Sequence, residues 1–152
     1  MKPLKLETFL PDRIDRVAAE VSRWLACVHR DDFGLSLPEW RTLATLGELG
    51  VCTATEISAH CQLHKTEVSR ALTALRKRRW INKTANQQDR REDLIKLTAS
   101  GRRSYTQLVA EMRNVERALK SMLGVGRARS LEKAFAELEA ALREDWTGAE
   151  SQ

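Results

Sequence analysis

The chain has 152 residues and a mass of 17.3 kDa, a length that favours one compact domain. Its 42% of hydrophobic residues is enough for a core and argues against a disordered chain. No apolar run approaches the roughly 18 residues of a membrane-spanning helix, and the opening MKPLKLETFLPDR has no signal-peptide pattern, so we expect a cytoplasmic protein.

The net charge is +5, and the positive excess is concentrated in one segment. Between His64 and Arg91 the chain carries nine lysines and arginines against two acidic residues, a net charge of +7. The rest of the chain therefore sums to −2. Such a segment predicts a polyanionic partner. The alternative is a basic face that meets only solvent.

Two helices are predicted before this segment. Residues 12–30 carry apolar side chains at intervals of three and four, which is typical of an amphipathic helix. After the break at DDFGLS, a second helix is expected to begin at the cap Ser36, with Glu39 in capping-box spacing, and to end at Gly50.

A helix-turn-helix and a wing are predicted next. TATEISAHC opens with Thr53 and Glu56 in capping-box spacing and predicts a short third helix. The turn QL leads to HKTEVSRALTALRKRR, a basic fourth helix with Val68, Leu72 and Leu75 on its inner face. INKTA and EDLIKL are β-compatible segments around the polar tip NQQDRR. Together these segments predict a winged helix-turn-helix.

The last third of the chain is predicted to be helical. LTASGRR begins a long helix, capped by Thr98, that carries a regular apolar seam. The seam residues are Tyr105, Leu108, Met112, Val115, Leu119 and Met122. Such a seam predicts a partner helix, although packing within the monomer is the alternative. GVG ends this helix, and a last helix follows. We expect a winged helix-turn-helix lobe at 32–100, a helical dimerisation region formed by 1–31 and 101–147, and a frayed tail at 148–152.

Five motifs resemble the MarR family of bacterial transcription regulators. They are LSLPEWRTLATL, TATEIS, VSRALTAL, DRR and LTASGR, in family order over about residues 35 to 103. The resemblance implies a mainly α fold with a small β-wing, and an obligate homodimer in which helices from both chain ends interlock. It also implies a regulator, usually a repressor, that binds a pseudo-palindromic operator. Effectors of the family commonly bind between the dimerisation helices and the DNA-binding lobe.

Two positions depart from the family pattern. His64 stands where the basic helix often has an Asp or Ser cap, and Arg79 stands where a glycine often follows that helix. A glycine there takes left-handed backbone at little cost. The helix must therefore end differently, or Arg79 must tolerate about 1 kcal/mol of strain.

By family register, the basic helix is expected to read the major groove. Its expected DNA-binding residues are Lys65, Thr66, Ser69, Arg70, Thr73, Arg76 and Lys77. Arg70 is expected to contact guanine, because its planar fork matches the O6 and N7 atoms of that base. Arg76, Lys77 and Arg78 are assigned to phosphates, with a solvated basic face as the alternative.

At the wing, Arg90 or Arg91 is expected to enter a minor groove, where narrow A·T-rich DNA concentrates negative potential. We favour Arg90 for that contact and a more structural role for Arg91. Asp89 would repel phosphate, so we expect it to orient the tip, by fixing an arginine or by capping the hairpin turn.

The effector site implied by the resemblance lies on the first two helices. The candidate residues are Trp24, His29, Trp40 and Arg41. Aromatic rings beside a cation would suit an aromatic acid or its coenzyme A thioester. Plain core packing for Trp40 and a surface charge for Arg41 are the alternatives.

Other functions are disfavoured by the motifs. Cys52, His60, Cys61 and His64 are acceptable zinc ligands, but no CxxC pair exists, and we expect no metal. Cys27 lies near the end of the first helix, whereas thiol-sensing family members use its start, so a redox-sensing regulator is only an alternative. Without GxSxG, HExxH or a P-loop we expect no enzyme and no cofactor. An architectural DNA-binding protein without an effector is the other alternative.

Overall fold

The computed structural model describes residues 3–89 and 91–149, with side chains described as far as residue 143. The chain forms two compact units, one ending at Met112 and the other beginning at Arg113. The predicted mainly α fold with a small β-wing is confirmed, because the described chain is mainly helical with one small antiparallel sheet. Within the described ranges, no helix is long and apolar enough to cross a membrane.

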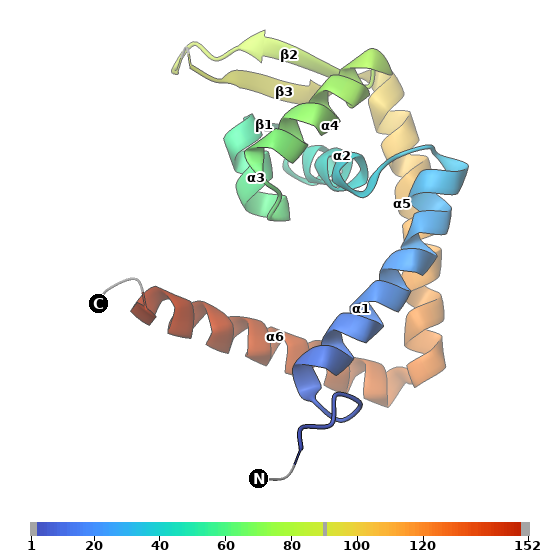
Figure 1. The fold of residues 1–152 in the computed structure, drawn as a ribbon. Helices are drawn as coiled ribbons and strands as arrows, with labels where there is room; N and C mark the ends of the chain where they lie inside the picture. The colour runs from blue at the N-terminus through green and yellow to red at the C-terminus, as the bar shows by residue number, and fades with distance from the viewer. Residues whose placement is uncertain (1–2, 90, 150–152) are drawn as a thin grey trace. The chain divides into compact units, whose positions relative to one another are not determined.

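The elements of the first unit follow the predicted order (Figure 1). They are α1 (Leu10–Ala26), the π-helix η1 (Cys27–Asp32), α2 (Leu37–Leu49), β1 (Val51–Cys52), α3 (Ala54–Cys61), α4 (Lys65–Lys77), β2 (Ile81–Ala85) and β3 (Asp93–Leu97). Helix α5 (Ala99–Leu123) begins in this unit, and α6 (Val125–Ala149) belongs to the second. The first predicted helix therefore begins close to its expected start and finishes as a π-helix.

The sheet has the strand order β1-β3-β2, with both pairings antiparallel. Strands β2 and β3 form the predicted hairpin, whose last pair joins Ala85 to Asp93. Strand β1 was not predicted, because two residues are too few to show an alternating pattern. It pairs Val51 with Lys96 and so attaches the hairpin to the end of α2.

One apolar core lies beneath the helix-turn-helix. Its members with no exposed surface are Leu35, Leu43, Leu46, Ile57, Val68, Leu75 and Leu108. The inner face predicted for α4 is confirmed, because Val68, Leu72 and Leu75 are all buried. Each such side chain contributes roughly 1.5–3 kcal/mol when it leaves water. The opposite face of α4 is consequently held toward solvent.

Both predicted capping boxes are confirmed. The Glu39 N–H donates to Ser36 Oγ at 3.4 Å, and the Ser36 N–H donates to Glu39 Oε2 at 2.9 Å. Thr53 and Glu56 form the same pair of bonds at 3.2 and 2.7 Å. Each box satisfies N–H groups that a helix start leaves without partners, so α2 and α3 begin where the sequence placed them.

Helix α4 ends in a left-handed residue. Arg79 has φ +59°, and the Trp80 N–H donates to the Leu75 carbonyl at 3.0 Å, which closes the end of the helix. Residue 79, where the family often has glycine, thus keeps a left-handed backbone here. Arg79 carries the backbone strain of that conformation. Such a conformation costs an L-residue roughly 1–2 kcal/mol.

Substituting glycine at this position is expected to stabilise the protein. Arg79→Gly relieves the strain but adds freedom to the unfolded chain, so the expected gain is about 0.5–1 kcal/mol. It would be measured as a higher urea midpoint. Arg79→Ala is the control, because it removes the same charge and keeps the strain. An equal gain in both variants would assign the effect to charge.

The second unit pairs the end of α5 with the start of α6. Gly124 (φ +77°) separates the two helices, and Ala128 and Val115 are buried. Lys120 Nζ lies 2.8 Å from a carboxylate oxygen of Glu116 on α5 and 2.8 Å from one of Glu132 on α6. These two hydrogen-bonded carboxylates raise the pKa of the Lys120 ammonium.

Much of the apolar surface of α6 stays exposed in the single chain. Leu131 and Phe135 are each 44% exposed, and Leu138 and Leu142 are 40% and 60% exposed. Apolar residues at helical spacing that remain in water are typical of a surface that meets a partner.

The predicted seam of α5 is divided between different environments. Leu108 belongs to the core of its own chain, and Tyr105 and Met112 pack against that core. In the second unit Val115 is buried, Leu119 is half-buried and Met122 is 74% exposed. Tyr105 lies so close to α2 that a Cβ on Gly47 would be 2.3 Å from its ring. The first part of the seam therefore serves the fold of the monomer.

Candidate nucleic-acid interface

The turn between α3 and α4 has a fixed geometry. Gln62 takes left-handed backbone with φ +52°, and its N–H donates to the Ser58 carbonyl. The Ser58 hydroxyl donates to the Leu63 carbonyl at 2.6 Å, and the half-buried Leu63 side chain packs on the core. These bonds close the turn and hold α4 across α3, as a helix-turn-helix requires.

The start of α4 has half of a capping box. The His64 N–H donates to Glu67 Oε2 at 3.0 Å. The Glu67 carboxylate also lies in the first turn, where the helix dipole favours negative charge. Glu67, one of the two acidic residues in the basic segment, therefore stabilises the start of α4.

All seven residues predicted to bind DNA from α4 lie on its exposed side. They are Lys65, Thr66, Ser69, Arg70, Thr73, Arg76 and Lys77. The stripe of Val68, Ala71, Leu72 and Leu75 is buried behind them. The Thr73 hydroxyl donates to the Ser69 carbonyl of its own helix at 2.9 Å, which leaves it an acceptor and a methyl group for a partner. The face is cationic, polar and open to solvent.

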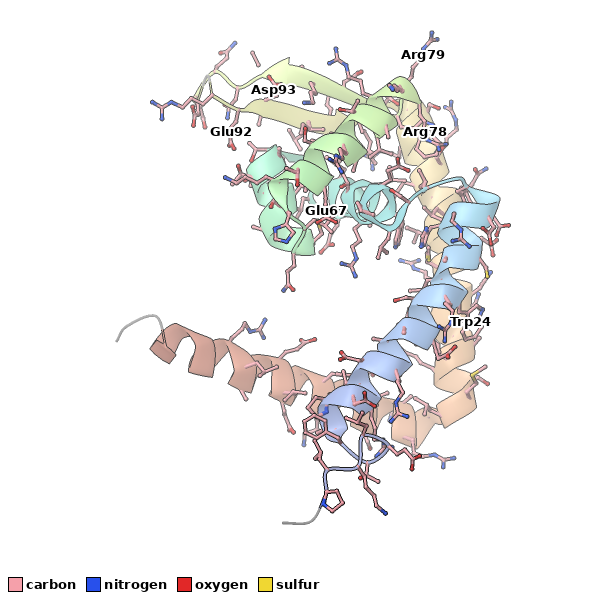
Figure 2. All side chains as sticks on the ribbon, viewed as in Figure 1. Trp24, Glu67, Arg78, Arg79, Glu92 and Asp93 are labelled. Atoms are coloured by element: carbon pink, nitrogen blue, oxygen red, sulfur yellow. The ribbon has the colours of Figure 1, made fainter. Side chains whose placement is uncertain are left out.

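Arg78, which was assigned to a phosphate from the sequence, has partners within its own chain (Figure 2). Its guanidinium donates to the carbonyls of Phe33 at 3.4 Å and Gly34 at 2.5 Å. It also lies over the Trp80 ring, 5.2 Å from the centroid. A planar fork of donors suits two neighbouring carbonyls and an aromatic face. Arg78 therefore joins the end of α4 to the turn before α2.

At the wing, Asp89 caps the hairpin turn. Its Oδ1 accepts a hydrogen bond from the Arg91 N–H at 2.9 Å, so of its two expected roles it takes the second. The Arg91 side chain is exposed. Arg90, favoured for the minor groove, lies outside the described residues. Asp93 lies 3.9 Å from Lys83 across the hairpin.

The four candidate effector residues have different environments. Trp24 on α1 and Trp40 on α2 are half-buried, and Trp40 packs against the core. His29 on η1 is 4% exposed, with its Nδ1 2.7 Å from the Leu35 carbonyl. Arg41 is exposed. The π-helix that carries His29 was not predicted, and such segments are frequent at functional sites.

Two of the four candidate zinc ligands have other hydrogen-bond partners. His60 Nε2 lies 3.0 Å from Glu48 Oε2, and the Cys61 thiol donates to the Ile57 carbonyl. In the described part of the chain, no three His, Cys, Asp or Glu residues form a group that could hold a metal ion.

The three thiols differ in exposure. Burial, with a smaller effect of Glu56, raises the pKa of the Cys52 thiol to about 11. Because the thiolate is the reactive form, Cys52 is inert near neutral pH. Cys61 is half-buried, and Cys27 is exposed.

The fold and the exposed cationic helix define a winged helix-turn-helix of the DNA-binding class. Residues 33–92 match the sequence profile described as the MarR family. The resemblance seen in the motifs is therefore confirmed over the winged helix, which is the part of the chain that matches the MarR family.

Known proteins support this assignment. The chain is 27% identical over 89 residues to the uncharacterised HTH-type transcriptional regulator YwoH of Bacillus subtilis, a match that covers 59% of this chain and 64% of that protein. The match therefore spans less than two thirds of the length of YwoH.

Solved structures show the same fold. The repressor CouR bound to a 23-mer DNA duplex has a TM-score of 0.81 at 21% identity, covering 91% of this chain and 99% of that one. NadR in complex with 4-hydroxyphenylacetate has a TM-score of 0.73 at 19% identity, covering 91% and 97%.

Proposed function

We propose that this chain is a sequence-specific transcriptional regulator, acting as a ligand-responsive repressor, that binds a pseudo-palindromic operator as a homodimer. The observation that carries the proposal is the face of α4, where all seven predicted contact residues are exposed above a buried apolar stripe. An α-helix of this kind fits the major groove, and its first turns reach base edges. The match of residues 33–92 to the MarR family and the DNA-bound structure of the similar CouR support the same partner.

The wing supplies the second contact. We assign the minor groove to the cationic tip, with Arg90 or Arg91 as the inserted side chain. The cap that Asp89 places on the turn directs its carboxylate to the backbone of Arg91. The Arg91 guanidinium is exposed beside it.

Exposed apolar helices support the homodimer. No residue of α1 is buried, and Leu10 and Val17 are each 62% exposed. The apolar residues of α6 are exposed in the same way. We therefore assign dimerisation to residues 1–31 and 101–147 and DNA binding to residues 32–100. A second copy related by a two-fold axis would place two α4 helices on the half-sites of a palindrome.

The effector is proposed to be an aromatic acid or its coenzyme A thioester. The similar NadR binds 4-hydroxyphenylacetate, and the candidate residues supply two indoles and a guanidinium. A chain of contacts leads from His29 through Leu35 and Gly34 to Arg78 at the end of α4. A ligand that moves His29 could therefore shift the position of α4. It releases DNA only if it binds the DNA-binding state and the DNA-free state of the dimer with different affinity.

A salt titration tests this function. We expect the log–log slope of affinity against salt to be near −7 for a dimer with about 8 phosphate contacts, because each contact contributes about 0.9. Fluorescence anisotropy would use DNA from the upstream intergenic region, with a scrambled duplex as control. It measures both the salt slope and the ratio of the affinities for the two duplexes.

The protein is expected to bind the duplex from the intergenic region at least about 1000-fold more tightly than the scrambled duplex. A slope shallower than about −3 would contradict the proposal. Equal binding to both duplexes would favour an architectural protein instead.

A further inference from the structure

The tip of the wing, together with Glu92 at its edge, is closed by hydrogen bonds within the hairpin. The Asn86 N–H donates to the Glu92 carbonyl at 3.3 Å, and the Glu92 N–H donates to the Asp89 carbonyl at 3.2 Å. The Gln88 N–H donates to Asn86 Oδ1 at 3.0 Å, and the Asp89 carboxylate caps Arg91. These bonds shape the tip, but they do not set its angle to the helices.

One side-chain hydrogen bond in the described part of the chain joins this tip to the helix-turn-helix. The Thr55 hydroxyl, in the first turn of α3, donates to Glu92 Oε1. Figure 2 shows Glu92 on the side of the hairpin that faces α3. Helix α3 is itself fixed by the buried Ile57 and by the Thr53 capping box. The bond therefore connects the tip to a rigid part of the lobe.

The acidic residues of the wing differ in where their hydrogen-bond or ion-pair partners lie. A carboxylate near the proposed groove contact repels phosphate, yet the wing carries Asp89, Glu92 and Asp93. Asp89 caps the turn, and Asp93 pairs with Lys83 across the hairpin. Both of these interactions lie within the hairpin, whereas the hydrogen-bond partner of Glu92 lies on α3.

We propose that Glu92 is a positioning residue, and that its hydrogen bond to Thr55 sets the angle between the wing tip and the recognition helix α4. Because α3 and α4 share one fixed turn, a tip held to α3 is also held relative to α4. The exposed Arg91 then reaches one groove while Arg70 and its neighbours reach the next. This inference rests on the proposed function, but the bond itself belongs to the free protein.

The first experiment therefore uses the protein without DNA. Backbone 15N relaxation would compare the wild type with Thr55→Val, Glu92→Ala and Glu92→Gln. Order parameters of Gln87, Gln88 and Arg91 are expected to fall below about 0.6 in the first two variants. Glu92→Gln is the matched control, because its amide oxygen accepts the same bond without the charge. Unchanged order in Thr55→Val and Glu92→Ala would overturn the proposal.

The second experiment measures affinity for a duplex selected from a random library with the wild-type protein. Thr55→Val and Glu92→Ala are each expected to weaken binding about 5-fold, because a loose tip must be ordered on DNA. The double variant should be no weaker than either single one. Arg91→Ala should cost less in the Glu92→Ala background than in the wild type, and Glu92→Gln should keep near wild-type affinity.

Each other outcome decides between named alternatives. Additive losses in the double variant would mean that Thr55 and Glu92 act separately on DNA, which contradicts the proposal. Tighter binding by Glu92→Ala would show that Glu92 only repels phosphate, and it also contradicts the proposal. If the wild type selects no duplex, the proposed function fails, and the relaxation result still decides whether the bond holds the tip.

Discussion

Gly101→Ala is expected to destabilise the protein by about 3 kcal/mol or more, at the upper end of what overpacking costs. A Cβ on this glycine would lie 2.0 Å from the Trp80 carbonyl oxygen and 2.8 Å from its carbonyl carbon. Those atoms are backbone and are held in place, because the Thr98 N–H donates to the same oxygen at 2.9 Å. The Thr98 hydroxyl also donates to the Arg79 carbonyl at 2.8 Å and accepts from the Gly101 N–H at 3.0 Å.

Urea unfolding followed by circular dichroism measures this loss. Two other glycines calibrate it. Gly126→Ala meets no atom within 4 Å and is expected to be neutral or to gain up to about 1 kcal/mol in its helix. Gly47→Ala meets the Tyr105 ring, a side chain that is able to turn, so its loss should be smaller than that of Gly101→Ala. An unchanged midpoint for Gly101→Ala would mean that α5 does not start against Trp80.

Features that depend on neighbouring residues were predictable from the sequence. The capping boxes at Ser36 and Thr53 span three residues, and the buried stripe of α4 repeats at helical spacing. The hairpin follows from two β-compatible segments around a polar tip. In these cases the physical cause lies within one or two turns of chain, so the pattern and the structure agree.

Features that join distant parts of the chain were not predictable. Arg78 meets Phe33 and Gly34 across 45 and 44 residues, and Thr55 meets Glu92 across 37. No periodicity relates such positions, so Arg78 looked like one more cation of a basic run.

The seam of α5 shows the same limit. Its spacing predicts an apolar face but does not say which surface covers that face. Leu108 is covered by the chain's own core, whereas Met122 stays exposed.

Arg70→Ala is expected to cost about 1–3 kcal/mol per half-site and to relax the sequence preference at one base pair. Arg70 is exposed, and it follows Ser69 on the face of α4 opposite the buried Ala71 and Leu72. Its bidentate guanidinium matches guanine, and the alanine side chain leaves those base acceptors without a donor. For a dimer on two half-sites the loss amounts to roughly 30-fold or more.

The matched control is Arg76→Ala, which removes the same charge from the last turn of the same exposed face. Both variants would be titrated on the selected duplex and on duplexes with one guanine changed in each half-site. Arg76→Ala should weaken all duplexes alike and make the salt slope shallower by about 1 per protomer, as a phosphate contact requires. The Arg70→Ala variant should instead have equal affinity for the unchanged duplex and for the duplex changed at one particular guanine, the one that Arg70 contacts. If Arg70→Ala weakens every duplex uniformly, Arg70 contacts phosphate, and another exposed residue of α4 reads the base.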